Sequence, residues 1–332
     1  MTHTIGITMG CPVGIGPEII LKLYAAWPHE RASQLVVLGD ADVLRRTSVE
    51  LELPARIVSW LPGDTVDPAT IPVYNLSSLD AGKLRWGHPD TATGRAMAGY
   101  IEEAVALCRN KTLSAMVTCP ITKVALNQAG YAYPGHTEML ASLTGAENYQ
   151  MMMAGQKLTV SLVTIHEPLS KVAGLLTVDK IQKCISMTAC SLADDLGMNN
   201  PRIAVAGLNP HGGEQGMFGT EERDIITPAI ESYSGDAEIS GPWPPDTVFH
   251  HAASGRFDAV VAMYHDQGLI PFKLLHFSDG VNVTLGLPIV RTSVDHGTAY
   301  DIAGKGKADC ASLAAACSLA AEIVSNRAKR ER

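Results

Sequence analysis

The sequence predicts an α/β fold built on a mainly parallel sheet, and three observations support this class. Short apolar runs of strand length alternate with longer segments of helical periodicity along the whole chain. The 332 residues are enough for one large or two medium domains. Apolar residues make up 46% of the chain and charged residues only 18%, a balance that suits a packed core rather than disorder.

The first third of the chain opens with a strand and then alternates between helices and strands. Ile5–Thr8 is a short apolar run, and the segment after it places Pro17 in the first turn of a helix, where proline is well tolerated. Arg95–Cys108 is a clear amphipathic helix because its apolar residues recur on one face. The other elements expected here are a strand at Leu35–Leu38, a helix from Asp42 and a strand at Ser114–Thr118.

The rest of the chain continues the alternation. Three apolar runs predict further strands, a helical period lies between the first two of them, and the Ala-rich run Ala311–Ala321 predicts a packed helix near the C-terminus. Pro242–Asp246 contains three prolines, and we expect a loop there. The three expected strands are Leu158–Thr164, Arg202–Leu208 and Asp258–Tyr264, and the helix is Val178–Leu196.

Charge and cysteine usage exclude several classes of protein. The net charge of −8 argues against nucleic acid as a partner, and the one basic cluster at the C-terminus (Arg327, Lys329, Arg330, Arg332) suits a solvated helix end. No run reaches the roughly 18 apolar residues of a membrane span, and no signal peptide precedes the first strand. The seven cysteines are odd in number and lack C-x-x-C spacing, so we expect a reduced, cytoplasmic protein.

Three histidines each follow one of the expected strands. His166 comes after Leu158–Thr164, His211 after Arg202–Leu208, and His265 after Asp258–Tyr264. Because parallel sheets bind ligands at the carboxyl ends of their strands, three imidazoles there can converge on one divalent cation, with Asp266 orienting a ring. The other interpretation is that each is an ordinary polar residue at a strand end.

Two segments carry groups suited to anions. His136 and Thr137 follow a turn and open a helix, where an N-terminal dipole favours a phosphate, although a plain helix cap has the same pattern. Lys273, Asn282 and Arg291 lie in a stretch with few acidic neighbours. Lysine and arginine both recognise phosphate, but each of these residues alone also suits an ordinary surface position.

The two glycine-rich segments match no nucleotide-binding fingerprint. Counting from Gly14, the dinucleotide pattern requires glycine at position 19, which is Ile19, and a P-loop is absent from the sequence. The Gly10–Pro17 turn can still present backbone donors to a crevice. In the polar loop His296–Gly306, Asp301 is a candidate acceptor for ribose hydroxyls or part of a helix N-terminal turn.

Taken together, these segments resemble the 4-hydroxythreonine-4-phosphate dehydrogenase family of pyridoxal-phosphate biosynthesis over essentially the whole chain. The resemblance rests on a combination of short motifs. The motifs are Ile7-Thr8-Met9-Gly10, Gly14-Ile15-Gly16-Pro17-Glu18, Pro134-Gly135-His136-Thr137-Glu138, Leu208-Asn209-Pro210-His211, Pro245-Asp246-Thr247, Met263-Tyr264-His265-Asp266-Gln267-Gly268, Asn282-Val283-Thr284 and Arg291-Thr292-Ser293-Val294-Asp295-His296-Gly297-Thr298.

The resemblance implies a role for each matching residue. It implies two α/β/α domains with a cleft between them, as in the isocitrate and isopropylmalate dehydrogenases, divided roughly into 1–130 plus 295–332 and 131–294. It also implies a homodimer with the active site at the interface, so that the metal ligands need not come from one chain. The implied residues are His166, His211 and His265 for the metal, His136, Thr137, Lys273, Asn282 and Arg291 for the substrate, and His296, Gly297 and Asp301 for the cofactor.

The chemistry implied is an NAD- or NADP-linked oxidation that needs a divalent metal, with zinc, cobalt and magnesium as candidates. The secondary alcohol of 4-phosphooxy-L-threonine would become a ketone, and the resulting 2-amino-3-oxo acid would lose carbon dioxide to give 3-amino-2-oxopropyl phosphate. Lys273 and Asp266 are the candidate general bases, and a metal-bound water relay is an equal alternative.

Other substrates and reactions remain open at this stage. Cys11, Val13 and Cys119 depart from the usual family pattern, so D-threonate 4-phosphate, D-erythronate 4-phosphate or a cis-dihydrodiol are alternative substrates. Two alternatives come from other classes of enzyme. One is a hydrolase that uses a three-histidine metal site, and the other is a phosphate acyltransferase that needs no metal.

Overall fold

The computed structural model describes residues 3–27 and 33–330, and the chain in it forms two units. Unit 1 comprises Met1–Glu147 and Leu287–Val324, and unit 2 comprises Asn148–Gly286 and Ser325–Arg332. The chain thus passes between the units after residues 147, 286 and 324, where the sequence suggested two crossings at about 130 and 294. Of the basic C-terminal cluster, Arg332 lies outside the described residues.

The sheet of unit 1 is parallel throughout its described strands. Their order is β3-β4-β2-β1-β5-β12, and each pairs in parallel with its neighbours. The carboxyl ends of these strands therefore share one edge, where the loops that follow them gather. The strands are β1 (His3–Thr8), β2 (Ser33–Gly39), β3 (Ile57–Ser59), β4 (Ile71–Asn75), β5 (Ala115–Thr118) and β12 (Arg291–Val294).

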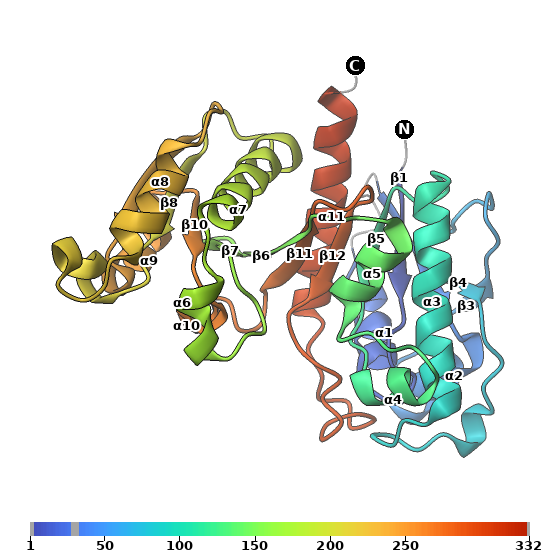
Figure 1. Cartoon of the computed structure of the whole chain (residues 1–332). Helices are drawn as coiled ribbons and strands as arrows, with labels where there is room; N and C mark the ends of the chain where they lie inside the picture. The colour runs from blue at the N-terminus through green and yellow to red at the C-terminus, as the bar shows by residue number, and fades with distance from the viewer. Residues whose placement is uncertain (1–2, 28–32, 331–332) are drawn as a thin grey trace. The chain divides into compact units, whose positions relative to one another are not determined.

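The helices of unit 1 lie around the strands of this sheet (Figure 1). The long helix α3 packs on β1, β2 and β5 through the face predicted from its periodicity, with Met97, Ile101 and Ala104 fully buried or nearly so. Its start is fixed by a capping box between Asp90 and Thr93. The helices are α1 (Gly16–Ala26), α2 (Ala41–Glu50), the short turn η1 (Ala81–Lys83), α3 (Thr91–Arg109), α4 (Lys123–Gln128) and α5 (His136–Thr144).

Unit 2 has a mixed sheet in which the parallel part carries the expected strands. The order is β11-β6-β7-β10-β8-β9, with β7, β10, β8 and β9 parallel and β6 antiparallel to both of its neighbours. The strands are β6 (Gln150–Ala154), β7 (Thr159–Leu162), β8 (Arg202–Ala206), β9 (Glu238–Trp243), β10 (Ala259–Ala262) and β11 (Val281–Leu285).

Alternate residues of β10 face two different hydrophobic clusters. Val260 and Ala262 belong to a cluster that also contains Phe272 of α10, while Val261 packs with Ile181 of α7. This alternation is the period of two of a strand covered on both faces. The helical segments are α6 (Leu169–Leu175), α7 (Val178–Cys190), η2 (Ser191–Asp195), η3 (Pro210–Gly216), η4 (Glu222–Ile226), α8 (Thr227–Glu231), α9 (Pro245–Ala253) and α10 (His265–Leu275).

The prediction of a loop at Pro242–Asp246 is wrong. Pro242 lies in β9 and Pro245 is the first residue of α9, so only Pro244 remains between the two elements. Proline is tolerated in β9 because this strand is the last of the sheet order, and Pro245 needs no donor at the start of a helix. Three prolines in five residues therefore mark a strand end and a helix start here, not a loop.

The last helix, α11 (Ala311–Arg330), contains the Ala-rich run and confirms the helix expected there. Its buried residues include Leu313, Ala316 and Ile323, which form an apolar face along the helix. Within residues 3–27 and 33–330, none of the helices combines the length and the apolar character that a bilayer crossing demands.

Candidate active site

The three singled-out histidines follow three neighbouring parallel strands of unit 2. In the sheet order, β10 lies between β7 and β8, and it pairs in parallel with both. His166 comes four residues after β7, His265 three residues after β10, and His211 lies in the segment that follows β8. The three strands that precede these histidines are therefore adjacent in the sheet.

Two of these rings lie near each other with their planes tilted by 39°, and one of them has a hydrogen-bonded carboxylate beside it. The ring centroids of His166 and His265 are 5.6 Å apart, while His211 packs at 6.4 Å from Phe218. The Nδ1 atom of His265 lies 2.7 Å from Oδ1 of Asp266. Because a carboxylate only accepts, Nδ1 carries a proton in this contact, and the neutral form of the ring then has its lone pair on Nε2.

This donor set has the chemistry that a divalent metal requires. A neutral imidazole with a carboxylate on its second nitrogen is the usual form of a metal-ligating histidine, and His265 has it in place. In the part of the chain that the structure describes, no three His, Cys, Asp or Glu side chains come close enough together to hold one ion. The structure thus brings His166 and His265 together but does not add His211 to them.

Buried side chains tie the three strand ends to one another. Thr164, after β7, donates from its hydroxyl to the carbonyl of Met263, after β10, at 2.8 Å. Gln267 accepts from the backbone N–H of Met263 and donates to the carbonyl of Gly207, after β8, both at 2.7 Å. The bonds from Thr164 to Met263 and from Gln267 to Gly207 could not be predicted from the sequence, because the sheet order brings these partners together.

Helix α10 carries two more of the predicted site residues. Asp266 is exposed in its first turn, and Lys273 is half-buried near its end, with Nζ 5.9 Å from the centroid of the Phe277 ring. Asn282 lies in β11 of the same unit and is half-buried. His136, Thr137 and Arg291 belong to unit 1.

In unit 1, a buried guanidinium and a half-buried imidazole lie at the start of helix α5. Arg291 is 3% exposed and donates from Nη2 to the hydroxyl of Thr118 at 2.7 Å. His136 and Thr137 are the first two residues of α5, so the positive end of that helix dipole is directed at the same turn. Nε2 of His136 is buried and has no hydrogen-bond partner among the described residues.

The charges at this turn shift the pKa values of both groups. Burial lowers the pKa of His136 well below its ordinary value, and the nearby Arg291 charge lowers it further. Burial also lowers the pKa of Arg291, which Glu138 in the same turn of α5 partly offsets. The result is a neutral imidazole beside a buried cation, with one nitrogen that lacks a partner, and an anion would supply that partner.

The shifted pKa of His136 predicts a pH dependence of stability. As pH falls below about 6.5, the unfolded chain takes up a proton at this residue before the folded chain does, so stability falls by at most about 1.4 kcal/mol per pH unit. His136→Gln removes this contribution and should flatten the slope. Urea unfolding of the apo protein between pH 7 and pH 5 measures it. Thr137→Val, which removes no titratable group, should keep the wild-type slope, and an unchanged slope in His136→Gln would contradict the assignment.

The predicted cofactor loop packs against the glycine-rich opening of the chain. The carbonyl of Thr298 accepts from the N–H of Ile15 at 3.2 Å, and the hydroxyl of Tyr300 lies 3.4 Å from the thiol of Cys11. Gly10 has φ +68° and an added Cβ would lie 2.4 Å from the carbonyl oxygen of Pro120, so only glycine fits there. The two glycine-rich segments are therefore brought together.

Two of the three cofactor candidates in this loop are accessible. Gly297 and Asp301 are exposed, and His296 is half-buried with its Nδ1 3.1 Å from the carbonyl of Gly297. Lys22 and Glu18 of α1 fix the far end of the loop, because Glu18 accepts from the N–H of Ala308 at 2.8 Å. The side chain of Asp301 is placed where a polar ligand can reach it.

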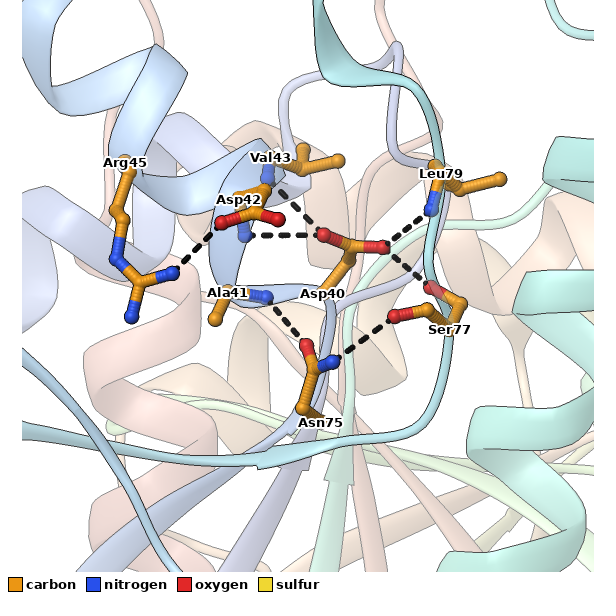
Figure 2. A network of polar contacts seen from close by, with 8 residues as sticks. All are labelled: Asp40, Ala41, Asp42, Val43, Arg45, Asn75, Ser77 and Leu79. Carbon is orange, nitrogen blue, oxygen red and sulfur yellow. Dashed lines mark hydrogen bonds and ion pairs between the residues drawn. The ribbon is translucent and has the colours of Figure 1, made fainter.

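A second acidic residue, Asp40, occupies the end of β2, where many dinucleotide-binding proteins hold a ribose. Figure 2 shows that its carboxylate is already used inside the protein: it caps α2 through Asp42 and Val43, and it accepts from Ser77 and Leu79 on the other side. Asp40 is 1% exposed. Its four donors leave no capacity for a ribose, which agrees with the failed fingerprint count.

Asp40→Ala is expected to destabilise unit 1 without affecting cofactor affinity. The change removes a helix cap and leaves two buried donors unsatisfied, for a loss of about 2–4 kcal/mol. Asp42→Ala, which breaks an exposed pair with Arg45, should cost less than about 1 kcal/mol. Chemical denaturation measures both, and equal losses would contradict the network in Figure 2.

Comparisons with known proteins extend over nearly the whole chain. The family model described as pyridoxal phosphate biosynthetic protein PdxA matches residues 30–320. The 4-hydroxythreonine-4-phosphate dehydrogenase of Desulfosudis oleivorans is 55% identical over 330 residues, which cover 98% of this chain and 97% of the relative. The solved structure of the Klebsiella pneumoniae 4-hydroxythreonine-4-phosphate dehydrogenase is 44% identical, covers 98% of both chains and has a TM-score of 0.89.

More distant solved structures share the fold alone. A branched-chain phosphotransacylase from Enterococcus faecalis is 13% identical with a TM-score of 0.55, over 97% of this chain and 99% of its own. The isocitrate dehydrogenase of Methylococcus capsulatus is 14% identical with a TM-score of 0.51, over 99% and 88%. The expected α/β fold of the isocitrate dehydrogenase kind is thereby confirmed. With a family model that matches most of its length and relatives that match it from end to end, the chain belongs to the PdxA family and is an oxidoreductase of pyridoxal phosphate biosynthesis.

Proposed function

We propose that the chain oxidises the secondary alcohol of 4-phosphooxy-L-threonine with a divalent metal held by unit 2 and a phosphate site in unit 1. The activity is that of a 4-hydroxythreonine-4-phosphate dehydrogenase, an oxidative-decarboxylating enzyme that takes NAD(P) as hydride acceptor. The observation that carries the metal site is the pair of rings at neighbouring strand ends, His166 and His265, with Asp266 fixing the tautomer of the second.

The metal ligands in the proposal are His166, His211 and His265. When bound, a divalent ion such as Zn²⁺, Co²⁺ or Mg²⁺ supplies Lewis-acid stabilisation of negative charge on the substrate oxygen, worth several kcal/mol. Asp266 keeps the proton of His265 on Nδ1, so that Nε2 remains a ligand. The ligand set is free to draw on both protomers of a dimer.

The phosphate site in the proposal consists of His136, Thr137 and Arg291. A phosphate there receives donors from the buried guanidinium, from Nε2 of His136 and from the start of α5. Binding energy gained at this non-reacting group positions the carbon that loses hydride. Lys273 and Asn282 are the substrate contacts assigned to unit 2.

The reaction moves one hydride and one proton before the carboxylate leaves. Hydride passes from the carbinol carbon to the nicotinamide, and the hydroxyl proton is lost. Lys273 is the residue assigned to take that proton, since Asp266 already accepts from His265. The product is a 3-oxo acid, and loss of carbon dioxide is easy because the carbonyl accepts the electron pair of the broken bond.

The cofactor is assigned to the loop that carries His296, Gly297 and Asp301. Asp301 is exposed there and can accept from ribose hydroxyls, whereas the buried Asp40 cannot. Seven free cysteines, five of them buried, support a reducing compartment, so the proposal places the enzyme in the cytoplasm.

A second copy of the chain is the proposed partner of helix α10. Ile270, Leu274 and Phe277 lie four and three residues apart on this helix and just beyond it, and they are 67%, 85% and 81% exposed. An apolar stripe of this exposure favours an interface, and it lies on the helix that begins with His265 and contains Lys273. The active site is therefore proposed to adjoin the interface of a homodimer.

A substrate panel with and without chelator tests the proposed function. Purified enzyme is incubated with NAD or NADP and with 4-phosphooxy-L-threonine, D-threonate 4-phosphate, D-erythronate 4-phosphate or a cis-dihydrodiol. Reduced nicotinamide and carbon dioxide should appear with the first substrate, stop with chelator and return with added metal. Phosphate release without cofactor would indicate a hydrolase, and full activity in a His166→Ala, His211→Ala double variant would indicate a metal-free enzyme.

A further inference from the structure

The segment that carries His211 has an unusual backbone. His211, Gly212, Gly213, Glu214 and Gln215 all have positive φ angles between 42° and 77°. For residues with a side chain, the left-handed region costs about 1–2 kcal/mol each. A run of this kind persists only where neighbouring groups hold it, so the contacts around it identify what fixes the position of His211.

One buried carboxylate binds the backbone immediately before this run. Oε1 of Glu222 accepts from the backbone N–H groups of Leu208 and Asn209 at 2.8 Å and 2.7 Å, and Oε2 accepts from the side-chain amide of Asn209 at 3.0 Å. Glu222 is 5% exposed and is the first residue of the π-helical turn η4. Three donors from the two residues before Pro210 thus meet at one side chain.

The glycines of the segment leave room for this carboxylate. A Cβ on Gly213 would lie 2.5 Å from Oε2 of Glu222, and a Cβ on Gly207 would lie 3.1 Å from Oε1. Gly213 also has φ +77°, so an alanine there is both strained and crowded. The backbone therefore wraps around the carboxylate from the end of β8 to Gly213, with His211 between the contact points.

We propose that Glu222 is a positioning residue that sets where His211 presents its imidazole to the catalytic metal. The proposal rests on the proposed function, since it takes His211 as a ligand. Glu222 touches neither metal nor substrate. It acts through the segment 208–213, whichever protomer's ion His211 serves. Side chains one step removed from a metal commonly change its affinity 10–100-fold.

The expected effects follow from the hydrogen bonds. In Glu222→Gln, the new amide nitrogen is a donor, and in either orientation it faces other donors: the backbone N–H groups of Leu208 and Asn209, or the side-chain amide of Asn209. Rotating the Asn209 amide does not relieve this, because its oxygen would then face the carboxylate of Glu221. We therefore expect Co²⁺ affinity to fall about 10-fold in Glu222→Gln and about 100-fold in Glu222→Ala. The visible spectrum of bound Co²⁺ should change in both. Activity at saturating metal should recover more than affinity does.

Equilibrium dialysis with Co²⁺ on the purified full-length enzyme tests the proposal. The series is wild type, His211→Ala, Glu222→Gln and the matched control Glu231→Gln, which makes the same change at an exposed glutamate ending α8. The proposal requires loss of affinity in His211→Ala, about 10-fold weaker binding with an altered spectrum in Glu222→Gln, and wild-type behaviour in Glu231→Gln.

Failure of the positioning role of Glu222 and failure of the proposed ligand set would give different results. Wild-type affinity and spectrum in Glu222→Gln, with binding lost in His211→Ala, would overturn the role of Glu222 and leave the ligand set intact. Wild-type affinity in His211→Ala would overturn the ligand set and the positioning role with it. Should Glu222→Gln lose its native circular dichroism, Gly213→Ala displaces the segment while keeping every donor and ligand, and it must weaken Co²⁺ binding for the proposal to stand.

Discussion

Replacing His265 by alanine is expected to reduce kcat/KM about 1000-fold, which corresponds to about 4 kcal/mol of lost transition-state stabilisation. The ring that this change removes is the one whose tautomer Asp266 fixes, so no other group restores the missing ligand. The loss should appear mainly in kcat and metal affinity. Steady-state kinetics at several metal concentrations, with metal content determined on the same samples, measures it.

Two further variants locate the effect at the metal. Asp266→Asn keeps a hydrogen-bonding side chain but weakens the orientation of His265, so a smaller loss of about 10–100-fold in metal affinity is expected. His250→Ala removes an exposed histidine of α9 in the same unit and should leave kinetics unchanged. If His265→Ala retained wild-type metal content and kcat, the assignment of His265 would be wrong.

Arg291→Met is expected to lower kcat/KM for the phosphorylated substrate about 100-fold. Each charge-assisted hydrogen bond to a phosphate contributes about 1.5–3 kcal/mol, and methionine provides none. The fold should survive, because methionine fills much of the same space and removes the cost of burying a charge. Arg291→Lys keeps the charge but loses the two-pronged hydrogen bonding of the guanidinium, so its kcat/KM should lie between those of wild type and Arg291→Met.

A substrate without phosphate separates binding from damage to the fold. Wild type and Arg291→Met should oxidise 4-hydroxythreonine equally slowly, because this substrate has no phosphate for Arg291 to bind. Arg56→Met, at a guanidinium whose side chain is 73% exposed, should match wild type on both substrates. Equal kcat/KM for the phosphorylated substrate in wild type and Arg291→Met would show that the phosphate lies elsewhere.

The parts of the fold that depend on local pattern could be predicted from the sequence. The face of α3 through Met97 and Ile101, the strand before His265 and the helix that begins at His136 all follow from periodicity or from the residues at their ends. The antiparallel strands β6 and β11 were not among the expected elements. β6 is Gln150–Ala154 with three methionines in a row, and it has neither alternation nor β-branched residues.

The candidate site likewise contains some residues that the sequence could identify and others that it could not. Each of the three histidines could be identified because it follows a predicted strand, and Asp266 is next to His265 in the sequence. Glu222 and Thr118 give no such signal, since Glu222 acts on Asn209 13 positions earlier and Thr118 receives Arg291 from 173 positions later. The sheet order creates these contacts, and it cannot be obtained from local pattern.

The shared metal ion is tested most directly by anomalous diffraction at the Co²⁺ absorption edge from crystals of the metal-loaded enzyme. The account predicts a single strong peak per active site, about 2.0–2.2 Å from nitrogen atoms of His166, His211 and His265, with Asp266 on the far nitrogen of the third ring. A peak that lacks any of these three ligands, or no peak near them in an active preparation, would contradict it.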